Sequence, residues 1–291
     1  MAAFSRILVP VVFSARCADA TRYAAALACR YGSELTLLHV FVPPFAAYAS
    51  PEGYATPPQL EVEAGLALVR TELDEFLRDE LRGCRVVREL IEGDPAHAIA
   101  GYAQNRKCDL IVMPTHGYGP FRRFLLGSVT AKVLHDARCP VFTGPHLEHP
   151  PALQSPCFHK VLCAIDLGPQ SRAVLEWGAW FAGEFAADLS VIHALPSGAA
   201  RLDGIYFDPQ WRNDLAAEAH GRIAALEDEL HNHAEIRIEG GDVPAVVSDA
   251  AETIGADLLV VGRGHLHGLL GRLRTNAYAI LRESPCPVVA I

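Results

Sequence analysis

A glycine-bearing loop between two apolar runs is the first stretch of this sequence with residues suited to chemistry. Residues 110–142 read LIVMPTHGYGPFRRFLLGSVTAKVLHDARCPVF, with Gly117 and the pair Gly127-Ser128 in the loop. Glycines allow positive φ angles and let backbone N–H groups approach an anion without a Cβ in the way. A helix that starts at Ser128 would add its N-terminal dipole, which favours negative charge. The spacing therefore predicts a phosphate-binding loop.

Pro114 stands where a glycine would suit such a loop better. Proline has no N–H and fixes φ at about −65°, so a phosphate donor or a favourable backbone angle is lost at this position. Arg122 and Arg123 could add phosphate contacts, but a solvated loop face is the simpler interpretation of such a pair.

Other catalytic and metal-binding motifs are weak. The sequence holds no Walker G-x-x-x-x-G-K-S/T pattern, no G-x-G-x-x-G fingerprint and no G-x-S-x-G nucleophile elbow. The pairs His231/His233 and His265/His267 could each give two metal ligands, whereas a zinc site needs three or four. Exposed histidines at a helix end and in a loop are the simpler interpretation. We assign no catalytic and no metal-binding residue.

Composition excludes several classes of function. The 291 residues carry a net charge of −9, which repels a nucleic-acid backbone. The apolar runs are too short to span a bilayer, and the N-terminal segment lacks the features of a signal peptide. We expect a cytoplasmic protein that binds neither nucleic acid nor membrane. Its eight cysteines form no C-x-x-C pair, so we expect them to be small buried hydrophobes.

The chain repeats itself. Four segments of the first half return in order in the second half, and His39 falls over His193, which indicates structural histidines bonded to backbone. The matching segments are RILVPVVFS (6–14) and KVLCAIDLG (160–168), LTLLHVF (35–41) and LSVIHAL (189–195), CDLIVMPTHG (108–117) and ADLLVVGRGH (256–265), and CPVF (139–142) and CPVV (286–289). The proline-rich segment between the copies is typical of a linker. We expect domains at 1–145 and 159–291, joined by a linker at 146–158.

Each copy alternates strands with helices. In the first copy we expect strands at 6–12, 34–41, 84–91, 109–114 and 139–142, and helices after Ser14, near 60–82, from Asp94 and from Ser128. Asp109 and Asp257 precede the fourth strands and should cap or anchor the preceding turn. Continuous apolar runs such as LIVM indicate strands buried on both faces. The pattern predicts an α/β fold of two tandem doubly wound parallel-sheet domains, with ligands at the carboxyl ends of the strands.

Both copies resemble the universal stress protein (UspA-type) domain. The resemblance rests on the opening strand with its VPV-like turn, the LLHV strand, the loop in which nine residues separate Gly117 from Gly127-Ser128, and the CPV final strand. It implies five strands per domain in the order 3-2-1-4-5 and domain pairing through the final strands, so that the two halves form a pseudo-two-fold pair. It also implies, in the ATP-binding branch of the family, a loop that cradles the phosphates and a first turn that holds the adenine side.

The first copy retains most of the phosphate half of such a site. Val12 replaces the aspartate that family members carry at the first turn, and Pro114 replaces the first loop glycine. The candidate nucleotide-binding residues of domain 1 are Pro10, Val12, Val40, Met113, Pro114, Gly117, Gly127, Ser128 and Val129.

The second copy departs in a complementary way. Its candidates are Asp166 at the first turn, Gly262 at the first loop glycine, and Thr275 at the Gly-Ser pair. Counted from Gly262, Thr275-Asn276 fall at the Gly-Ser pair, and counted back from Cys286, Arg274-Thr275 fall there, so the loop carries an insertion. A positive φ at His265 or Arg274 would be strained. We expect this site to be degraded.

Three functions remain open at this point. The leading hypothesis is a regulatory or sensing protein that binds ATP, with Mg²⁺, in domain 1 and hydrolyses it slowly if at all. The second is a scaffold or protein-interaction module without nucleotide. The third is a binder of another small ligand beneath the loop at 42–60, where Phe45, Tyr48 and Tyr54 lie. A homodimer is compatible with each.

Overall fold

The computed structural model describes most of the chain. The described residues are 4–42, 49–50, 53–54, 59–115, 126–144, 147, 157–196, 209–263 and 275–291. Gly117, Arg122 and Arg123 of the glycine loop lie outside them, as do His265 and Arg274 of its counterpart. Phe45 and Tyr48 are also outside, so the proposed lid at 42–60 stays untested.

The first half of the chain alternates strands and helices, as the sequence predicts. Its strands are β1 (Arg6–Pro10), β2 (Glu34–Phe41), β5 (Arg85–Glu92), β6 (Leu110–Val112) and β7 (Val141–Thr143), and a short hairpin comprises β3 (Ala49–Ser50) and β4 (Gly53–Tyr54). Its helices are α1 (Ala15–Tyr31), α2 (Gln59–Glu75), α3 (Pro95–Asn105) and α4 (Ser128–Asp136).

The second half repeats this order. Its strands are β8 (Lys160–Ala164), β9 (Asp188–Pro196), β10 (Glu235–Gly241), β11 (Leu258–Val261) and β12 (Val288–Ala290). Its helices are α5 (Ser171–Phe185), α6 (Pro209–Leu230), α7 (Val243–Ile254) and α8 (Thr275–Glu283).

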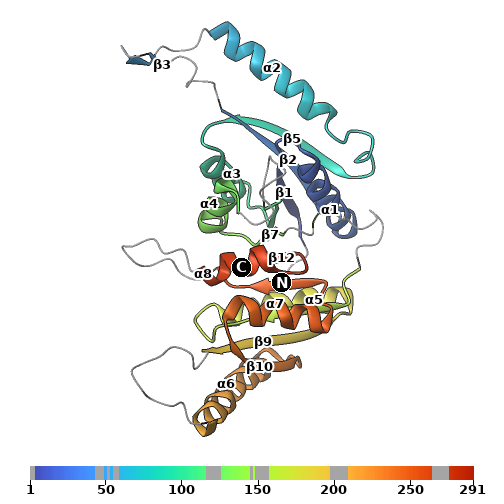
Figure 1. The fold of residues 1–291 in the computed structure, drawn as a ribbon. Coiled ribbons are helices and arrows are strands. Elements are labelled where there is room, and N and C mark those ends of the chain that lie inside the picture. Colours follow the sequence, from blue (N-terminus) through green and yellow to red (C-terminus); the bar gives the residue numbers. More distant parts are fainter. Residues whose placement is uncertain are drawn as a thin grey trace.

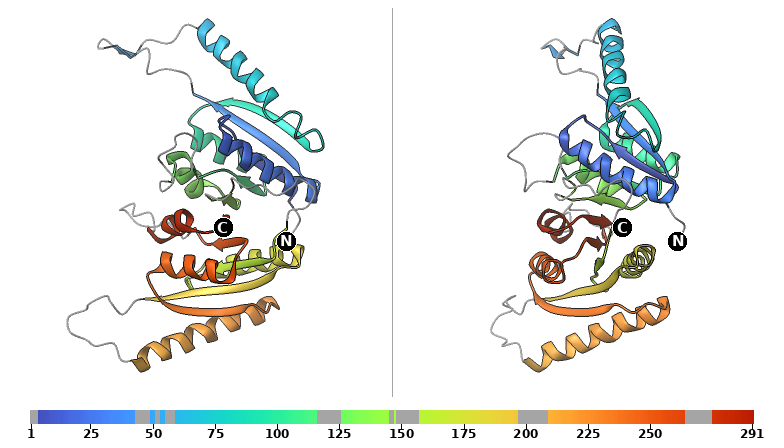
Figure 2. Two further views of the ribbon diagram at one scale, coloured as in Figure 1. Left: turned by 45° about the vertical axis from the view of Figure 1, so that its right-hand side comes forward. Right: turned by 90° about the vertical axis from the view of Figure 1, so that its right-hand side faces the viewer.

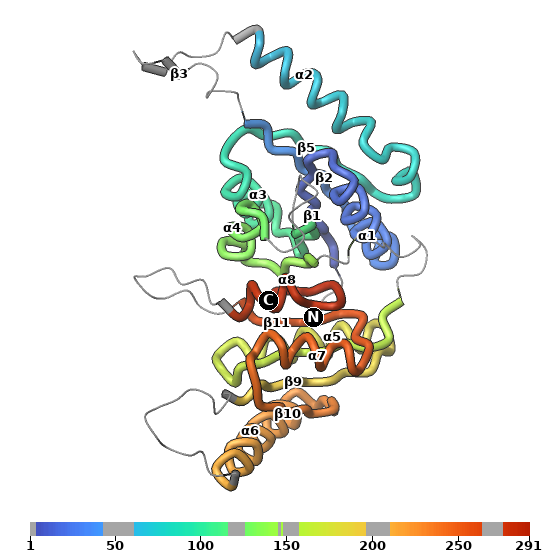
Figure 3. The backbone as a smooth tube through the Cα atoms, in the orientation of Figure 1, coloured from blue at the N-terminus to red at the C-terminus, as the bar shows by residue number. Residues whose placement is uncertain are grey.

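One ten-stranded sheet runs through both halves (Figure 1). Its order is β10-β9-β8-β11-β12-β7-β6-β1-β2-β5, which is 3-2-1-4-5 in each half once the β3–β4 hairpin is set aside. Strands within a half are parallel, and the final strands β7 and β12 pair antiparallel, with Phe142 opposite Val289. The expected strand order is confirmed, and the halves pair through their final strands as the resemblance implies. Figure 3 traces the backbone through this arrangement, with β11 and α8 near the middle of the molecule.

Two layers of helices cover the sheet (Figure 2). Residues of α1, α2, α5 and α6 pack into the core on one face, and residues of α3, α4, α7 and α8 pack on the other. The central strands are therefore buried on both sides, as their continuous apolar runs predict. Among the described residues, no helix combines the length and apolar character needed to cross a membrane.

The helix ends follow from local chemistry. Ser14 caps α1 by accepting a hydrogen bond from the N–H of Cys17 at 3.3 Å, and α1 ends at Gly32, whose φ of 67° suits glycine. Asp94 caps α3 by accepting from the N–H of His97 at 3.1 Å. The second helix of the chain is shorter than expected: α2 ends at Glu75 instead of near 82, and a series of turns follows.

Asp109 and Asp257 play matching roles in the two halves. Oδ2 of Asp109 accepts from the N–H groups of Ser5 at 2.7 Å and Arg6 at 2.8 Å. Oδ2 of Asp257 accepts from the N–H groups of His159 at 2.6 Å and Lys160 at 3.0 Å. Each carboxylate thus anchors the start of the first strand of its domain. Contrary to our expectation, it does not anchor the turn before the fourth strand.

Aromatic side chains join the two halves on the α1–α5 face. Phe4 lies 5.1 Å from Trp180 and 5.2 Å from Tyr31, measured between ring centroids. In the second half Phe158, which falls within the expected linker, is 2% exposed and packs 6.3 Å from Tyr23. Because the ring of each half contacts a helix of the other, apolar burial supports the joint alongside the β7–β12 pairing.

The expectation that all eight cysteines are buried is wrong. Four are buried, namely Cys17, Cys108, Cys163 and Cys286, whereas Cys84 and Cys139 are partly buried and Cys29 and Cys157 are exposed. Small apolar character alone does not determine burial, because these positions fall at helix ends and strand starts near the surface.

Candidate functional site

A cavity of about 310 Å³ opens at the carboxyl ends of the first-domain strands. Its lining includes Pro10 at the end of β1 and Val12 after it, Val40 of β2, Met113 and Pro114 after β6, and Gly127, Ser128 and Val129 at the start of α4. The other lining residues are Val11, Cys17, Leu38, Pro95, Ile99 and Thr130. Of the nine candidate residues in this domain, Gly117 alone lies outside the described residues, and the other eight meet in this cavity. They converge because parallel strands bring their carboxyl ends to one edge of the sheet.

The turn after β1 forms one wall. The N–H of Val11 donates to the carbonyl of Leu38 at 2.9 Å, and Phe13 follows with a φ of 54°. Phe13 stacks on the imidazole of His39, with the two ring centroids 4.7 Å apart. Nδ1 of His39 lies 2.9 Å from the carbonyl oxygen of Val11. Because a carbonyl only accepts, this nitrogen carries the proton, and burial lowers the pKa of His39.

His39 is therefore a structural histidine, as expected. The second domain repeats the contact, with Nδ1 of His193 lying 2.9 Å from the carbonyl oxygen of Ile165. Leu167, which corresponds to Phe13, also has a positive φ, of 56°.

Pro114 keeps the base of the glycine loop closed. Its carbonyl, which proline retains, accepts from Oγ1 of Thr130 at 3.1 Å. The adjacent residue, Thr115, accepts at its carbonyl from the N–H of Gly127 at 2.8 Å. Residues 114–115 and 127–130 are thus held together by bonds that do not need an N–H at position 114.

The N-terminus of α4 borders the cavity without a side-chain cap. Gly127 is the N-cap residue, with φ −62° and ψ 144°, and among the described residues no side-chain hydrogen bond caps the helix. The first N–H groups of a helix have no partner within it, and an N-cap Ser or Asp would bind one of them. Glycine has no side chain to bind these amides, and Ser128 beside it is exposed. Such an arrangement suits an anion.

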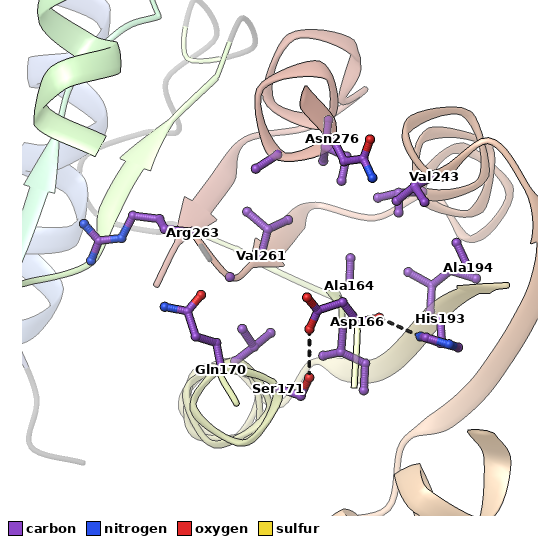
Figure 4. A pocket seen from close by; sticks show the side chains of 17 residues that line it. Ala164, Asp166, Gln170, Ser171, His193, Ala194, Val243, Val261, Arg263 and Asn276 are labelled. Atoms are coloured by element: carbon purple, nitrogen blue, oxygen red, sulfur yellow. Dashed lines mark hydrogen bonds between the residues drawn. The ribbon is translucent and has the colours of Figure 1, made fainter. Parts of the chain in front are cut away.

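The second domain has a larger cavity, of about 620 Å³, at the equivalent place (Figure 4). Asp166 and Gly262 line it, as the sequence predicts. Thr275 begins α8, and the next residues, Asn276 and Ala277, contribute to the lining. Ser171, which the repeat aligns with Cys17, also lines this cavity.

Asp166 is held within its own turn. Its Oδ1 accepts from the N–H of Gly168 at 2.8 Å and from Oγ of Ser171 at 3.4 Å. Gly168 fits closely, because a Cβ there would come 2.8 Å from the same oxygen. The bond from the N–H of Gly168 to the side chain two residues earlier forms an Asx turn. The carboxylate therefore shapes the turn while it faces the cavity (Figure 4).

Arg263 is a feature that we did not single out from the sequence. Its backbone borders the second cavity, but its side chain turns towards the first domain (Figure 4). The guanidinium donates to the carbonyls of Ala137 at 2.6 Å, Cys139 at 3.1 Å and Leu134 at 3.3 Å. Burial lowers its pKa, yet the carbonyls at the end of α4 favour a cation. The repeat aligns Arg263 with Thr115, so an arginine stands at this position in the second copy only. That difference between the copies was the one sign in the sequence of a special role.

Metal binding has little support among the described residues. His231 and His233 are exposed after the end of α6, and His265 and His267 lie outside the described ranges. Within those ranges, no group of three or more His, Cys, Asp or Glu side chains is placed to hold a metal ion.

Comparison with known proteins agrees with this architecture. The universal stress protein family matches the chain twice, over residues 3–143 and 158–291. A universal stress protein of Methanocaldococcus jannaschii is 31% identical over 142 residues, covering 47% of this chain and 80% of that protein. Another, from Thermus aquaticus, is 35% identical over 141 residues, covering 47% of this chain and 96% of that protein.

A solved structure shows the same fold across both halves. The crystal structure of a universal stress protein from Archaeoglobus fulgidus has a TM-score of 0.68 and 20% identity, and the match covers 98% of this chain and 95% of that one. The family match in each half, the strand order and the paired final strands together lead to one conclusion. The chain belongs to the universal stress protein family and carries two of its domains in tandem.

Proposed function

We propose that this protein is a stress-response regulator or sensor that binds an adenine nucleotide, ATP, in the first-domain cavity. The observation that carries the proposal is the meeting of eight candidate residues in one cavity beside the uncapped start of α4. We place the domains at 1–145 and 159–291, with the linker between them and the protein in the cytoplasm.

The lining chemistry supports a phosphate-weighted ligand. Pro10, Val40 and Met113 offer an apolar wall suited to the faces of a base. At the start of α4, beside Gly127, the first N–H groups are hydrogen-bond donors for a phosphate. The positive end of the helix dipole also favours the anion there. Val12 provides no carboxylate to accept from the nucleoside. Most of the binding free energy is therefore expected from the phosphates, with Mg²⁺ bound together with them.

The second cavity is less suited to a polyphosphate. Asp166 keeps the carboxylate of the first turn, but the guanidinium of Arg263 is engaged with the first domain and is not available to a phosphate. His265 and Arg274 replace glycines of the loop, where a positive φ would be strained. We therefore assign the second domain a degraded nucleotide site.

Hydrolysis has no evident general base among the described residues. Cys17 is the one titratable side chain of the described lining, and it is 2% exposed within the core. General-base catalysis needs a group within hydrogen-bond reach of the attacking water. We propose binding with slow turnover at most.

Calorimetric titration of nucleotide-free protein with Mg-ATP tests the proposal. We expect about one equivalent to bind, and we expect tripolyphosphate to compete far better than adenosine. Gly127→Glu should abolish binding, because it places a carboxylate at the phosphate position. The N-cap backbone angles of Gly127 are accessible to any residue, so the fold should persist.

Arg274→Glu is the matched control, since Arg274 occupies the corresponding position of the second domain. It should leave the stoichiometry and affinity unchanged. Loss of binding in this variant with retention in Gly127→Glu would move the site to the second domain. No heat and no thermal stabilisation at any nucleotide concentration would leave the scaffold function in place of nucleotide binding.

A further inference from the structure

Two cysteines that lie far apart in the sequence meet at the surface of the first domain. Cys29 lies in the last turn of α1, and Cys84 directly precedes β5. Their sulfur atoms are 2.8 Å apart although the two residues are 55 positions apart in the sequence. Cys29 is exposed and Cys84 is partly buried.

The fold fixes this meeting on both sides. The chain leaves α1 through Gly32 and enters β2, whose first residue, Glu34, pairs with Arg85 of β5. Cys84 is held by its own N–H, which donates to the carbonyl of Leu81 at 2.9 Å. The pairing of β2 with β5 therefore brings the end of one helix beside the start of the edge strand.

We propose that Cys29 and Cys84 form a redox-active thiol pair that a peroxide converts to an intramolecular disulfide. The thiolate of Cys29 attacks the peroxide, the O–O bond breaks, and Cys29 becomes a sulfenic acid while one water or alcohol leaves. The sulfur of Cys84 then attacks that of Cys29, the S–O bond breaks, and the proton of Cys84 leaves with the hydroxide as water. Two thiols together lose two electrons, and the peroxide gains them.

The surroundings set the order of these steps. Exposed thiols encounter the oxidant first, and the thiolate is the reacting form. Cys29 is the exposed partner, whereas burial, followed by the contact with Cys29, raises the pKa of Cys84 to about 12. Cys29 is thus the peroxide-reactive thiol and Cys84 the resolving thiol.

The disulfide would lie beside the joint between the domains. Arg30 follows Cys29 and donates to the carbonyl of Glu184, and its guanidinium lies 4.2 Å from the ring centroid of Phe185. Tyr31 stacks 6.4 Å from Trp180. Oxidation would link the end of α1, which contacts the second domain, to the edge strand β5. Closing so long a loop restricts the unfolded chain and raises stability.

Peptide mapping of the full-length protein tests the pair directly. Reduced protein is treated with increasing hydrogen peroxide, remaining thiols are alkylated, and the digest is analysed without reduction. We expect a linked peptide pair containing Cys29 and Cys84, reversed by dithiothreitol. The melting temperature of the oxidised protein should rise by roughly 5 °C.

Three serine variants assign the roles. Cys84→Ser should accumulate a dimedone-reactive sulfenic acid at Cys29, and Cys29→Ser should leave Cys84 reduced at the same dose. Cys157→Ser removes another exposed thiol and should behave like the wild type. The proposal is overturned if wild-type Cys29 and Cys84 stay alkylatable at peroxide doses that oxidise Cys157, or if Cys29 links only to a second molecule. The wild-type map alone decides this should a variant fail to fold.

Discussion

Replacing Arg263 with methionine should destabilise the protein through the joint between its halves. The guanidinium donates to three carbonyls, that of Leu134 in the last turn of α4 at 3.3 Å and those of Ala137 and Cys139 just after the helix at 2.6 and 3.1 Å. Methionine keeps much of the apolar stem but donates nothing, so these carbonyls lose their charged partner. The change isolates the hydrogen bonds from the packing of the side chain.

The expected magnitude follows from the bonds. A hydrogen bond to a charged group contributes about 1.5–3 kcal/mol net. Two of the three are short enough to count fully, and desolvation of the guanidinium, which lowers its pKa, offsets part of their sum. We expect a loss of about 3 kcal/mol in the free energy of unfolding. For a chain of this size that corresponds to a melting temperature lower by roughly 5–10 °C.

Urea unfolding followed by tryptophan fluorescence provides the measurement, because Trp177 and Trp180 lie at the joint. Arg282→Met is the control: Arg282 pairs with Glu283 at the surface of α8, where an ion pair contributes about 1 kcal/mol or less. Arg263→Lys should fall between wild type and methionine, since lysine keeps the charge without the fork of donors. A stability change below about 0.5 kcal/mol for Arg263→Met would refute the assigned role.

Three further predictions concern individual positions. Val12→Asp should tighten Mg-ATP binding about tenfold by restoring a charged acceptor at the first turn, measured by calorimetry; unchanged affinity would separate the turn from the ligand. Gly178→Ala should cost about 2 kcal/mol in urea unfolding, since its Cβ would lie 2.2 Å from Sγ of Cys163, whereas Gly183→Ala, with nothing within 4 Å of the new Cβ, should not destabilise. Burial lowers the pKa of His39, so the unfolded chain binds the proton more tightly and stability should fall as pH drops below about 6.5; the His39→Gln variant should lose this part of the pH dependence.

The fold could be predicted from the sequence because its signals are repeated and local. Apolar strand-length runs alternate with helical patterns in both halves. The strands and helices predicted for one half therefore support those predicted for the other. Glycine and serine at the ends of α1 mark its limits through their own backbone and side-chain chemistry. The length of α2 was less predictable, because no proline or capping glycine ends it at Glu75.

The first-domain cavity was also predictable, residue by residue. Pro10, Val40 and Met113 follow or end parallel strands, and such ends share one edge of a sheet whatever the side chains are. The sequence could not show that Gly127 leaves the start of α4 uncapped, because this depends on which side chains fold back onto it.

The contacts that sequence reasoning missed depend on how distant elements meet. In the sequence, Arg263 looks like an ordinary loop residue after β11. Its side chain reaches the carbonyls at the end of α4 only because β7 and β12 pair antiparallel and bring the two domains together. Cys29 and Cys84 meet because β2 pairs with β5 in one register. A different register would separate the two thiols, and no local feature of the sequence specifies which residues of β2 and β5 pair.

The two halves have diverged in their cavities while keeping a common joint. Domain 1 retains the uncapped helix start but has Val12, whereas domain 2 retains Asp166 and turns Arg263 away from its cavity. The helix α4 links these differences, since Tyr278 of α8 donates to the carbonyl of Ala131 at 3.1 Å and Arg263 holds its final carbonyls. These bonds from the second domain hold the middle and the end of α4, whose first residues border the first cavity. Preorganised donors bind an anion at a lower entropic cost, so we expect the second domain to support the anion site proposed for the first domain.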